Sequence, residues 1–362
     1  MVGRSSLAIA VAIIAVIVAA LAAAAWAGYM GTAPLGGVTP ANRICLKDLA
    51  NRTVCISGEA KRVVSLWPEA TRIVIALRAG DRLVGVSIYD KRDPIMLKVW
   101  PRLGKLPAVG TTDAPNIEEI RRLKPDVILA DARRGDALDK LQELAGVPVV
   151  GVRINVGVEG RFSYKAFEIV GKILGGRHEK RGEELAKYLE DKLDAIRKRV
   201  SQIPLGKRLR VYIAFARSPL ITLGLADPAE SAGLINVALS PGRVWYPVNL
   251  EQVARWNPDI IAVHVLSKRL GNYTVETLLR DPAWRSVKAV REGRVYNVIL
   301  GYVGWYPAMT VVNTLQLAKI AYPQLFKDID VVKVGNEVFK KLYGVDNLFT
   351  EIAREFGLYT PG

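Results

Sequence analysis

The sequence is poor in the residue types that metal binding and nucleophilic catalysis most often use. Of its 362 residues, 2 are Cys and 2 are His, and two cysteines are too few for a structural zinc site. It contains no GxSxG, HExxH or P-loop motif, which argues against the hydrolase and nucleotide-binding classes that these motifs mark. We therefore expect a binding protein, with no catalytic residue, no cofactor and no metal held by the protein itself.

Glutamine is also scarce, whereas basic residues are in excess. Gln occurs only at 142, 202, 252, 316 and 324, a composition that leans toward a heat-adapted (thermophile) source. The 51 Lys and Arg against 35 Asp and Glu give a formal charge of +16. These cations are scattered over helical segments with acids between them, and there is no Arg-rich arm. We interpret them mainly as a solvated surface and expect no nucleic-acid partner.

One long segment lacks charge altogether. Residues 7–27 are almost wholly apolar and as a helix would span roughly 30 Å of hydrocarbon. Arg4 precedes the run and the next charge is Arg43, so the positive-inside rule places everything after residue 27 outside the cytoplasm. Small residues at 22–27 also permit a cleaved signal peptide. Both readings predict an extracytoplasmic protein, anchored or secreted, with residues 28–42 as a Gly/Pro/Thr tether.

The two cysteines lie close together in "RICLKDLANRTVCIS". Two short β-prone runs flank a turn there, so a hairpin would place Cys45 and Cys55 nearly opposite each other. Outside the cell such a pair is expected to form a disulfide. We interpret it as a covalent link within the mature N-terminus and expect no reactive thiol.

One phrase occurs twice: "NIEEIRRLKPDVILA" at 116–130 and "NLEQVARWNPDIIAV" at 249–263. Asn116 and Asn249 are good helix N-caps, and Glu119 and Gln252 three residues later complete the sequence pattern of a capping box. A Pro then ends each helix, and an unbroken apolar run follows that is typical of a parallel strand buried on both faces. The repeat therefore predicts two similar α/β lobes.

The order of the predicted elements divides the chain into five parts. Strands and helices alternate on both sides of a helical stretch of about forty residues, interrupted at "GGRH", where we expect His178 at the surface. The predicted parts are an anchor or signal at 1–27, a linker and hairpin at 28–58, an N-terminal lobe at 59–162, a connecting helix at 163–202 and a C-terminal lobe with terminal helices at 203–362.

Ligands of parallel sheets bind beyond the carboxyl ends of the strands, and the residues expected there are aromatic and Arg-rich. Aromatic side chains offer flat apolar contact, and Arg offers forked donors for an anion. The candidate ligand-binding residues are Trp67, Tyr89, Thr112, Asp131, Arg133, Arg153, Arg217, Trp245, Tyr246, His264, Tyr302 and Trp305. His264 could also bind iron or cobalt, although a lone His is more often an ordinary polar residue.

These phrases, with "RVVSLWPEATRIVIALRAGDRLVGVSIYD" and "PAWRSVKAVREGRVYNV", resemble the iron-siderophore and cobalamin class of ABC-transporter substrate-binding proteins, also called periplasmic binding proteins of class III. The resemblance covers most of residues 43–320. It implies an α/β fold of two Rossmann-like lobes with parallel sheets joined by one long rigid helix. It also implies delivery of a metal chelate to a permease driven by a cytoplasmic ATPase.

The resemblance further assigns roles to single residues. Glu118 and Glu251 match the acids that pair with Arg on the permease, and both lie in the first turn of a helix, where the dipole favours them. Ligand contacts match Tyr89, Thr112, Asp131, Tyr246 and the Trp305 region. The chain departs from siderophore binders at "GWYPA" and from cobalamin binders at Thr112 and Asp131, and some relatives bind molybdate or tungstate.

These observations lead to one main hypothesis and two alternatives. The first is a monomeric extracytoplasmic receptor for an iron(III)-siderophore-type chelate, held to the membrane through its N-terminal segment. The second is a transport receptor for a corrinoid or for molybdate or tungstate. The third, remote alternative is an anchored metalloenzyme that uses His264 and Asp131.

Overall fold

A computed structural model describes residues 43–154, 162–225, 227–240, 243–265, 275–300 and 306–360. From Arg43 onward these residues belong to one compact unit. The apolar run 7–27 and the tether 28–42 lie outside them, so the anchor stays a prediction. Within the part that is described, no helix is both long and apolar enough to cross a membrane.

The described chain begins with a hairpin of two antiparallel strands, β1 (Arg43–Lys47) and β2 (Thr53–Ser57). Cys45 lies opposite Cys55 in this register, and the two sulfurs are joined at 2.08 Å. The buried carboxylate of Asp48, in the turn, accepts hydrogen bonds from the backbone N–H of Arg52 at 2.8 Å and of Gly151 at 2.9 Å. Because Gly151 belongs to the first sheet, this carboxylate fastens the hairpin to the N-terminal lobe.

The first sheet has four parallel strands in the order β4-β3-β5-β6. Its strands are β3 (Val63–Ser65), β4 (Leu83–Val86), β5 (Val127–Asp131) and β6 (Val149–Val152). Every residue of β3, β5 and β6 is buried, as expected for strands covered on both faces. The helices that connect them are α2 (Pro68–Ala76), α3 (Pro94–Val99), α4 (Ile117–Leu123) and α5 (Gly135–Ala145).

The repeated phrase forms the predicted unit twice. The Asn116 side chain accepts from the Glu119 N–H at 3.1 Å at the start of α4, and Asn249 accepts from the Gln252 N–H at 2.8 Å at the start of α9 (Leu250–Trp256). A full capping box also requires the Glu119 side chain to accept from the backbone N–H of Asn116. This second hydrogen bond is absent at the first site, so that part of the prediction was wrong. The Asn116 N–H donates to the Val109 carbonyl instead, and the Glu119 carboxylate is held by Arg122 at 2.6 Å.

Two helices, α6 (Lys165–Leu174) and α7 (Arg177–Val200), connect the lobes. The break between them falls on Gly175 and Gly176, which both have positive φ, at 68° and 52°, a conformation that glycine adopts without strain. His178 was expected at the surface, and this was wrong. It lies inside α7, buried, with Nδ1 2.8 Å from the Leu77 carbonyl oxygen, because α7 packs its first turn against the end of α2.

The second sheet has six strands, in the order β10-β8-β7-β11-β12 with β9 beside β7. The strands are β7 (Arg210–Phe215), β8 (Ser218–Leu223), β9 (Ile235–Asn236), β10 (Trp245–Pro247), β11 (Ile260–His264) and β12 (Val295–Val298). We expected a parallel sheet, but β8 runs antiparallel to both of its neighbours, β7 and β10. Only Ala216 and Arg217 separate β7 from β8, too few residues for the crossover that a parallel pair requires.

One fully buried helix lies at the centre of the C-terminal region. All fifteen residues of α12 (Pro307–Ala321) are buried, and the helix packs against α7, α8 (Asp227–Ser231) and α13 (Val331–Tyr343). A helix without a polar face must be covered all round. The remaining α-helices of this region are α10 (Val275–Arg280), α11 (Lys288–Arg291) and α14 (Leu348–Phe356).

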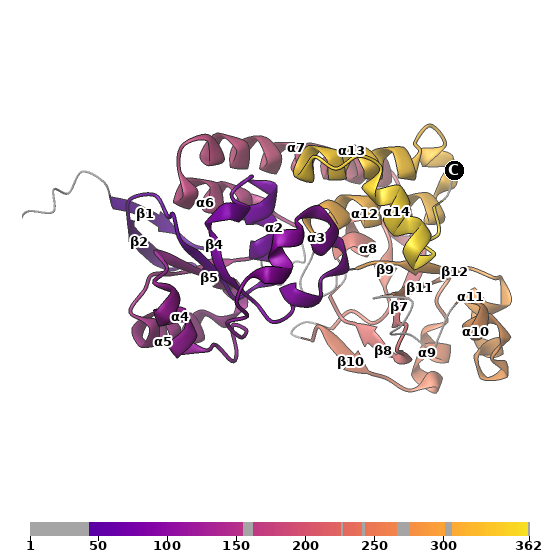
Figure 1. Ribbon diagram of the computed structural model, residues 1–362. Coiled ribbons are helices and arrows are strands. Elements are labelled where there is room, and N and C mark those ends of the chain that lie inside the picture. The colour runs from indigo at the N-terminus through magenta and orange to yellow at the C-terminus, as the bar shows by residue number, and fades with distance from the viewer. Residues whose placement is uncertain are drawn as a thin grey trace, which may run out of the picture. The chain divides into compact units, whose positions relative to one another are not determined.

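A buried polar network joins α2 and α3 to the start of α12. The guanidinium of Arg72 donates from Nε to Asp93 at 3.0 Å and lies 3.7 Å from the centre of the Tyr306 ring. The Tyr306 hydroxyl donates to the same Asp93 carboxylate. Figure 1 shows α2 and α3, in indigo and purple, next to the yellow C-terminal helices. The N-terminal lobe is therefore fastened to the C-terminal region by charged and aromatic groups as well as by α7.

Candidate ligand-binding site

Five of the predicted ligand residues gather at the carboxyl ends of the first sheet. We call this group the Asp131 cluster; it consists of Trp67, Thr112, Asp131, Arg133 and Arg153. Trp67 follows β3, Asp131 ends β5 beside Val152 of β6, and Arg153 follows β6. Since β3, β5 and β6 are neighbours in the sheet, their ends bring these side chains together.

Asp131 is the centre of this cluster. Its Oδ2 accepts from Nε and Nη2 of Arg133 at 2.9 and 2.7 Å. Its Oδ1 accepts from the Arg133 backbone N–H at 3.1 Å and from Nη1 of Arg153 at 3.3 Å. Its own backbone N–H donates to the Thr112 hydroxyl at 3.1 Å. One carboxylate thus holds two guanidinium groups, and the three charged side chains carry a net charge of +1.

The two arginines differ in exposure. The Arg153 side chain is 7% exposed, whereas that of Arg133 is 41% exposed and its guanidinium carbon lies 5.6 Å from the centre of the Trp67 ring. A guanidinium over an indole face gains a cation–π attraction. The Trp67 Nε1 is buried and has no hydrogen-bond partner among the described residues. The cluster therefore combines a flat apolar surface with forked cationic donors.

A second group lies at the end of the second sheet, where Phe215, Trp245 and His264 stack. The His264 ring centre is 5.4 Å from that of Trp245 and 5.7 Å from that of Phe215. His264 Nδ1 accepts from the Leu300 backbone N–H at 3.0 Å, which leaves Nε2 as the protonated nitrogen of the neutral ring. Trp245 is 38% exposed. We call these three residues the His264 stack; they give this lobe an aromatic surface.

No metal centre is evident at His264. Among the residues that the structure describes, no group of three or more His, Cys, Asp and Glu is placed to hold a metal ion. His264 is buried between aromatic rings. The geometry therefore describes His264 as a stacking partner of Trp245.

The other candidates are placed separately. Tyr89 is exposed at the end of β4, and Arg217 is exposed in the β7–β8 turn. The Tyr246 hydroxyl donates to the Ala238 carbonyl at 2.6 Å, and the Arg243 guanidinium carbon lies 5.5 Å from its ring centre. Tyr302 and Trp305 lie outside the described residues.

The two acids of the repeated phrase are both at the surface. Glu118 lies in the first turn of α4 and Glu251 in the first turn of α9, and both are exposed. Neither carboxylate forms an ion pair or a side-chain hydrogen bond with any described residue, whereas the neighbouring Glu119 pairs with Arg122. Each lobe thus presents one unpaired carboxylate at an equivalent place.

The deep polar residues were not anticipated. Arg72 and Asp93 are fully buried, and Asp90 beside them accepts from Ser87 and Thr71. Burial raises the pKa of Asp90 to about 7, against an opposing effect of Arg72. The sequence gives one sign of this buried network, which is an Arg within the apolar run "ATRIVIA". The partners of that Arg lie far along the chain and could not be identified from the local sequence.

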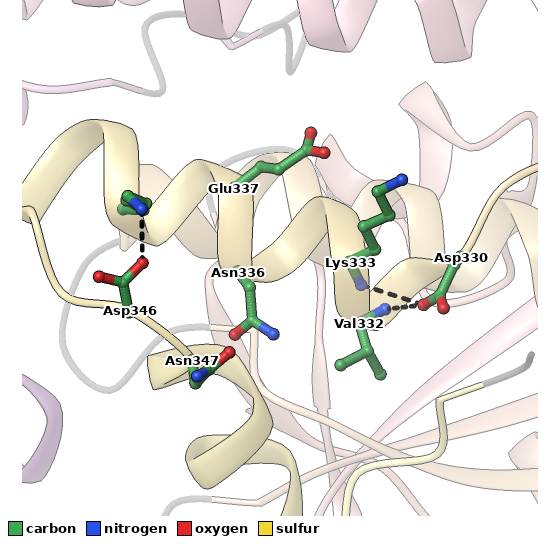
Figure 2. Close-up of a pocket in the computed structure, with 8 residues that line it drawn as sticks. Asp330, Val332, Lys333, Asn336, Glu337, Asp346 and Asn347 are labelled. Atoms are coloured by element: carbon green, nitrogen blue, oxygen red, sulfur yellow. Dashed lines mark hydrogen bonds and ion pairs between the residues drawn. The ribbon is translucent and has the colours of Figure 1, made fainter.

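A surface hollow of about 430 Å³ lies on the C-terminal helices α13 and α14. Figure 2 shows that its side chains serve the helices themselves: Asp330 caps α13 through the N–H of Val332 and Lys333, and Asp346 pairs with a lysine. Asn336 donates to Thr350 at 2.7 Å. Asp330, Asn336 and Asp346 are thus engaged in bonds that hold the helices together, so we do not interpret this hollow as the ligand site.

The chain is similar in sequence to a known protein family. The sequence profile of the family described as periplasmic binding protein matches residues 63–298. The molybdate-binding protein MolA of Haemophilus influenzae is 26% identical over 295 residues, which cover 74% of this chain and 82% of MolA. The Fe(3+) dicitrate-binding periplasmic protein FecB of Escherichia coli is 28% identical over 242 residues, covering 62% and 72% of the two chains.

Solved structures agree on the fold. The structure of MolA bound to molybdate superposes with a TM-score of 0.69 at 24% identity, covering 84% of this chain and 98% of that one. A periplasmic solute binding protein from Veillonella parvula gives a TM-score of 0.71 at 21% identity, covering 87% and 97%. The chain therefore belongs to the periplasmic binding protein family, as an extracytoplasmic substrate-binding protein of an ABC importer and not an enzyme.

Proposed function

We propose that the protein captures an anionic iron(III) chelate of the siderophore or citrate type in a cleft between its two lobes. The observation that carries this proposal is the Asp131 cluster, with its net positive charge and its Arg133–Trp67 pair at the strand ends of the N-terminal lobe. The His264 stack offers flat apolar surface at the corresponding ends in the C-terminal lobe. A bulky anion with organic ligands around its metal suits both features.

Delivery to a permease completes the proposed role. Residues 7–27 hold the receptor at the outer face of the membrane, or direct its secretion, and the receptor acts as a monomer. Glu118 and Glu251 contact the permease, one from each lobe. The relative FecB is named for Fe(3+) dicitrate, which supports the iron-chelate ligand.

A second candidate ligand is molybdate or tungstate. It is favoured by the similarity to MolA, which extends over 74% of the chain, and by the same arginines, which suit an oxyanion. A small tetrahedral anion would leave the aromatic surfaces of Trp67 and Trp245 unused, and for this reason we place the iron chelate first.

A thermal-shift screen followed by calorimetry separates these ligands. The purified protein is tested against ferric dicitrate, ferric siderophores, haem, cyanocobalamin, molybdate and tungstate. A ligand at 100 times its Kd stabilises the folded state by about 2.7 kcal/mol, which a melting curve resolves. We expect stabilisation by a ferric chelate. Stabilisation by molybdate or by cyanocobalamin alone would replace the iron proposal, and native mass spectrometry of protein from its source would identify the ligand carried there.

A further inference from the structure

Resting on the proposed function, we propose that Asp131 is a positioning residue that sets Arg133 and Arg153 as a paired fork for a carboxylate or oxyanion group of the ligand. The sequence alone suggested that Asp131 touches the ligand itself. The geometry points elsewhere, because this carboxylate is already fully used inside the protein.

The acceptor capacity of Asp131 is taken up by its two neighbours. An ionised carboxylate accepts about four hydrogen bonds, and Asp131 accepts four: three from Arg133 and one from Arg153, between 2.7 and 3.3 Å. Asp131 is 3% exposed. A ligand would have to displace an arginine in order to reach either oxygen.

The arginines, in contrast, keep donors to spare. Arg153 uses only Nη1, and its Nε and Nη2 donate to none of the described residues. Arg133 gives Nε and Nη2 to Asp131 and retains Nη1. Shared attachment to one carboxylate, together with the Trp67 ring under Arg133, fixes both planes before a ligand arrives. Such preorganisation lowers the entropic cost of binding.

The charge balance defines what the fork accepts. Two guanidinium groups and one carboxylate leave a surplus of +1 among these three side chains, and the neighbouring Arg134 is itself paired with Asp113 at 2.8 Å. A further buried acid, Glu69, lies beside the cluster and accepts from the backbone N–H of Ile154, the residue after Arg153. A carboxylate or oxyanion group compensates this surplus and matches the planar donors of arginine. A neutral ligand accepts hydrogen bonds from the fork but does not compensate its charge.

Asp131→Asn distinguishes positioning from a simple charge effect, because the two predict opposite signs. Removal of a negative charge raises the local positive potential, so a field effect alone predicts tighter anion binding. Loss of the charged acceptor releases both arginines, so positioning predicts affinity weaker by about tenfold. The matched control is Asp113→Asn, which removes the same charge from the exposed pair with Arg134. Calorimetry with ferric dicitrate and molybdate measures both, after circular dichroism and melting have established folding.

A double-mutant cycle with Arg153→Lys tests whether Asp131 acts through its neighbour. Arg153→Lys keeps the charge but loses the fork, and we expect weaker anion binding. Adding Asp131→Asn should then cost less than it does in the wild type. Full additivity would mean that Asp131 contacts the ligand independently and would overturn the proposal. If Asp131→Asn does not fold, unchanged affinity in both Arg133→Lys and Arg153→Lys would overturn it as well.

The same titrations separate this inference from the proposed function. Binding of cyanocobalamin alone, unaffected by the variants, would overturn the fork but leave a transport receptor. Binding of molybdate and not ferric dicitrate, weakened by the variants, would support the fork and replace the iron chelate. A wild-type protein that binds none of these probes would overturn both.

Discussion

Asp227, the first residue of α8, is a buried acid whose carboxylate oxygens have no hydrogen-bond partner among the described residues. Burial, with a smaller contribution from Glu230, raises its pKa from 3.8 to about 8. Between these values the folded protein holds a proton that the unfolded chain has released. The free energy of unfolding therefore falls as pH rises through this window.

Asp227→Asn should remove this pH dependence while keeping the shape of the side chain. We expect the stability of the variant, relative to wild type, to rise steadily from pH 4.5 to pH 7.5 in urea denaturation. Asp328→Asn is the control, because Asp328 is exposed and its hydrogen bonds with Arg199 hold its pKa at about 2. The difference in the free energy of unfolding between Asp328→Asn and wild type should stay constant over the same pH range. Parallel curves for wild type and Asp227→Asn would contradict the prediction.

The position of a single residue could be predicted from the sequence only where nearby residues determine it. Asp131 and Arg153 could be placed together because buried apolar runs mark the strands, and parallel strands end at one edge. Arg72 could not be paired in this way. Asp93 follows it by 21 residues, and Tyr306 lies in the other half of the chain. Nothing in the local pattern of α2 reveals these distant partners.

At the scale of single elements, the capped helices of the repeat offer a direct test. Asn116 satisfies the Glu119 N–H at the start of the seven-residue helix α4, and loss of such a cap costs about 1 kcal/mol. Asn116→Ala should therefore lower the free energy of unfolding by about that amount, whereas Asn116→Asp should be nearly neutral because Asp also caps. Asn249→Ala, at the equivalent position in α9, should match Asn116→Ala in urea denaturation. Equal stability of the Ala and Asp variants would show that the cap is not used.

The elements that the sequence missed share a physical cause. Strands β8 and β10 pair antiparallel at one side of the second sheet, and Tyr246 of β10 lies opposite Thr222 of β8. Buried residues alternate irregularly with half-buried ones in β8, and no residue of β10 is fully buried, so both strands lack the unbroken apolar runs that marked β5 and β11. Trp245 and Tyr246 were predicted as ligand-binding residues and not as part of a strand, because aromatic residues are common both in binding sites and in strands.

At the scale of the whole molecule, the two halves are both similar and firmly connected. Each has its own sheet and one copy of the capped helix. Contacts such as the hydrogen bond of 2.6 Å between the hydroxyls of Tyr164 and Thr310 join the region before α6 to α12. We infer that any closure around a ligand is small, because the network of Arg72, Asp93 and Tyr306 would otherwise have to break.

This arrangement gives Glu118 and Glu251 their expected role as paired contacts for a permease. Dipole complementation alone is worth about 0.3–1 kcal/mol for each and does not require either carboxylate to be exposed and unpaired. The double variant Glu118→Ala plus Glu251→Ala should abolish uptake into cells or vesicles that carry the cognate importer, while calorimetry shows unchanged ligand affinity. The control is Glu143→Ala plus Glu292→Ala, which removes two exposed acids, one from each half. Since both doubles change the net charge equally, loss of uptake in both would indicate a general electrostatic effect, and normal uptake in the first would end the docking hypothesis.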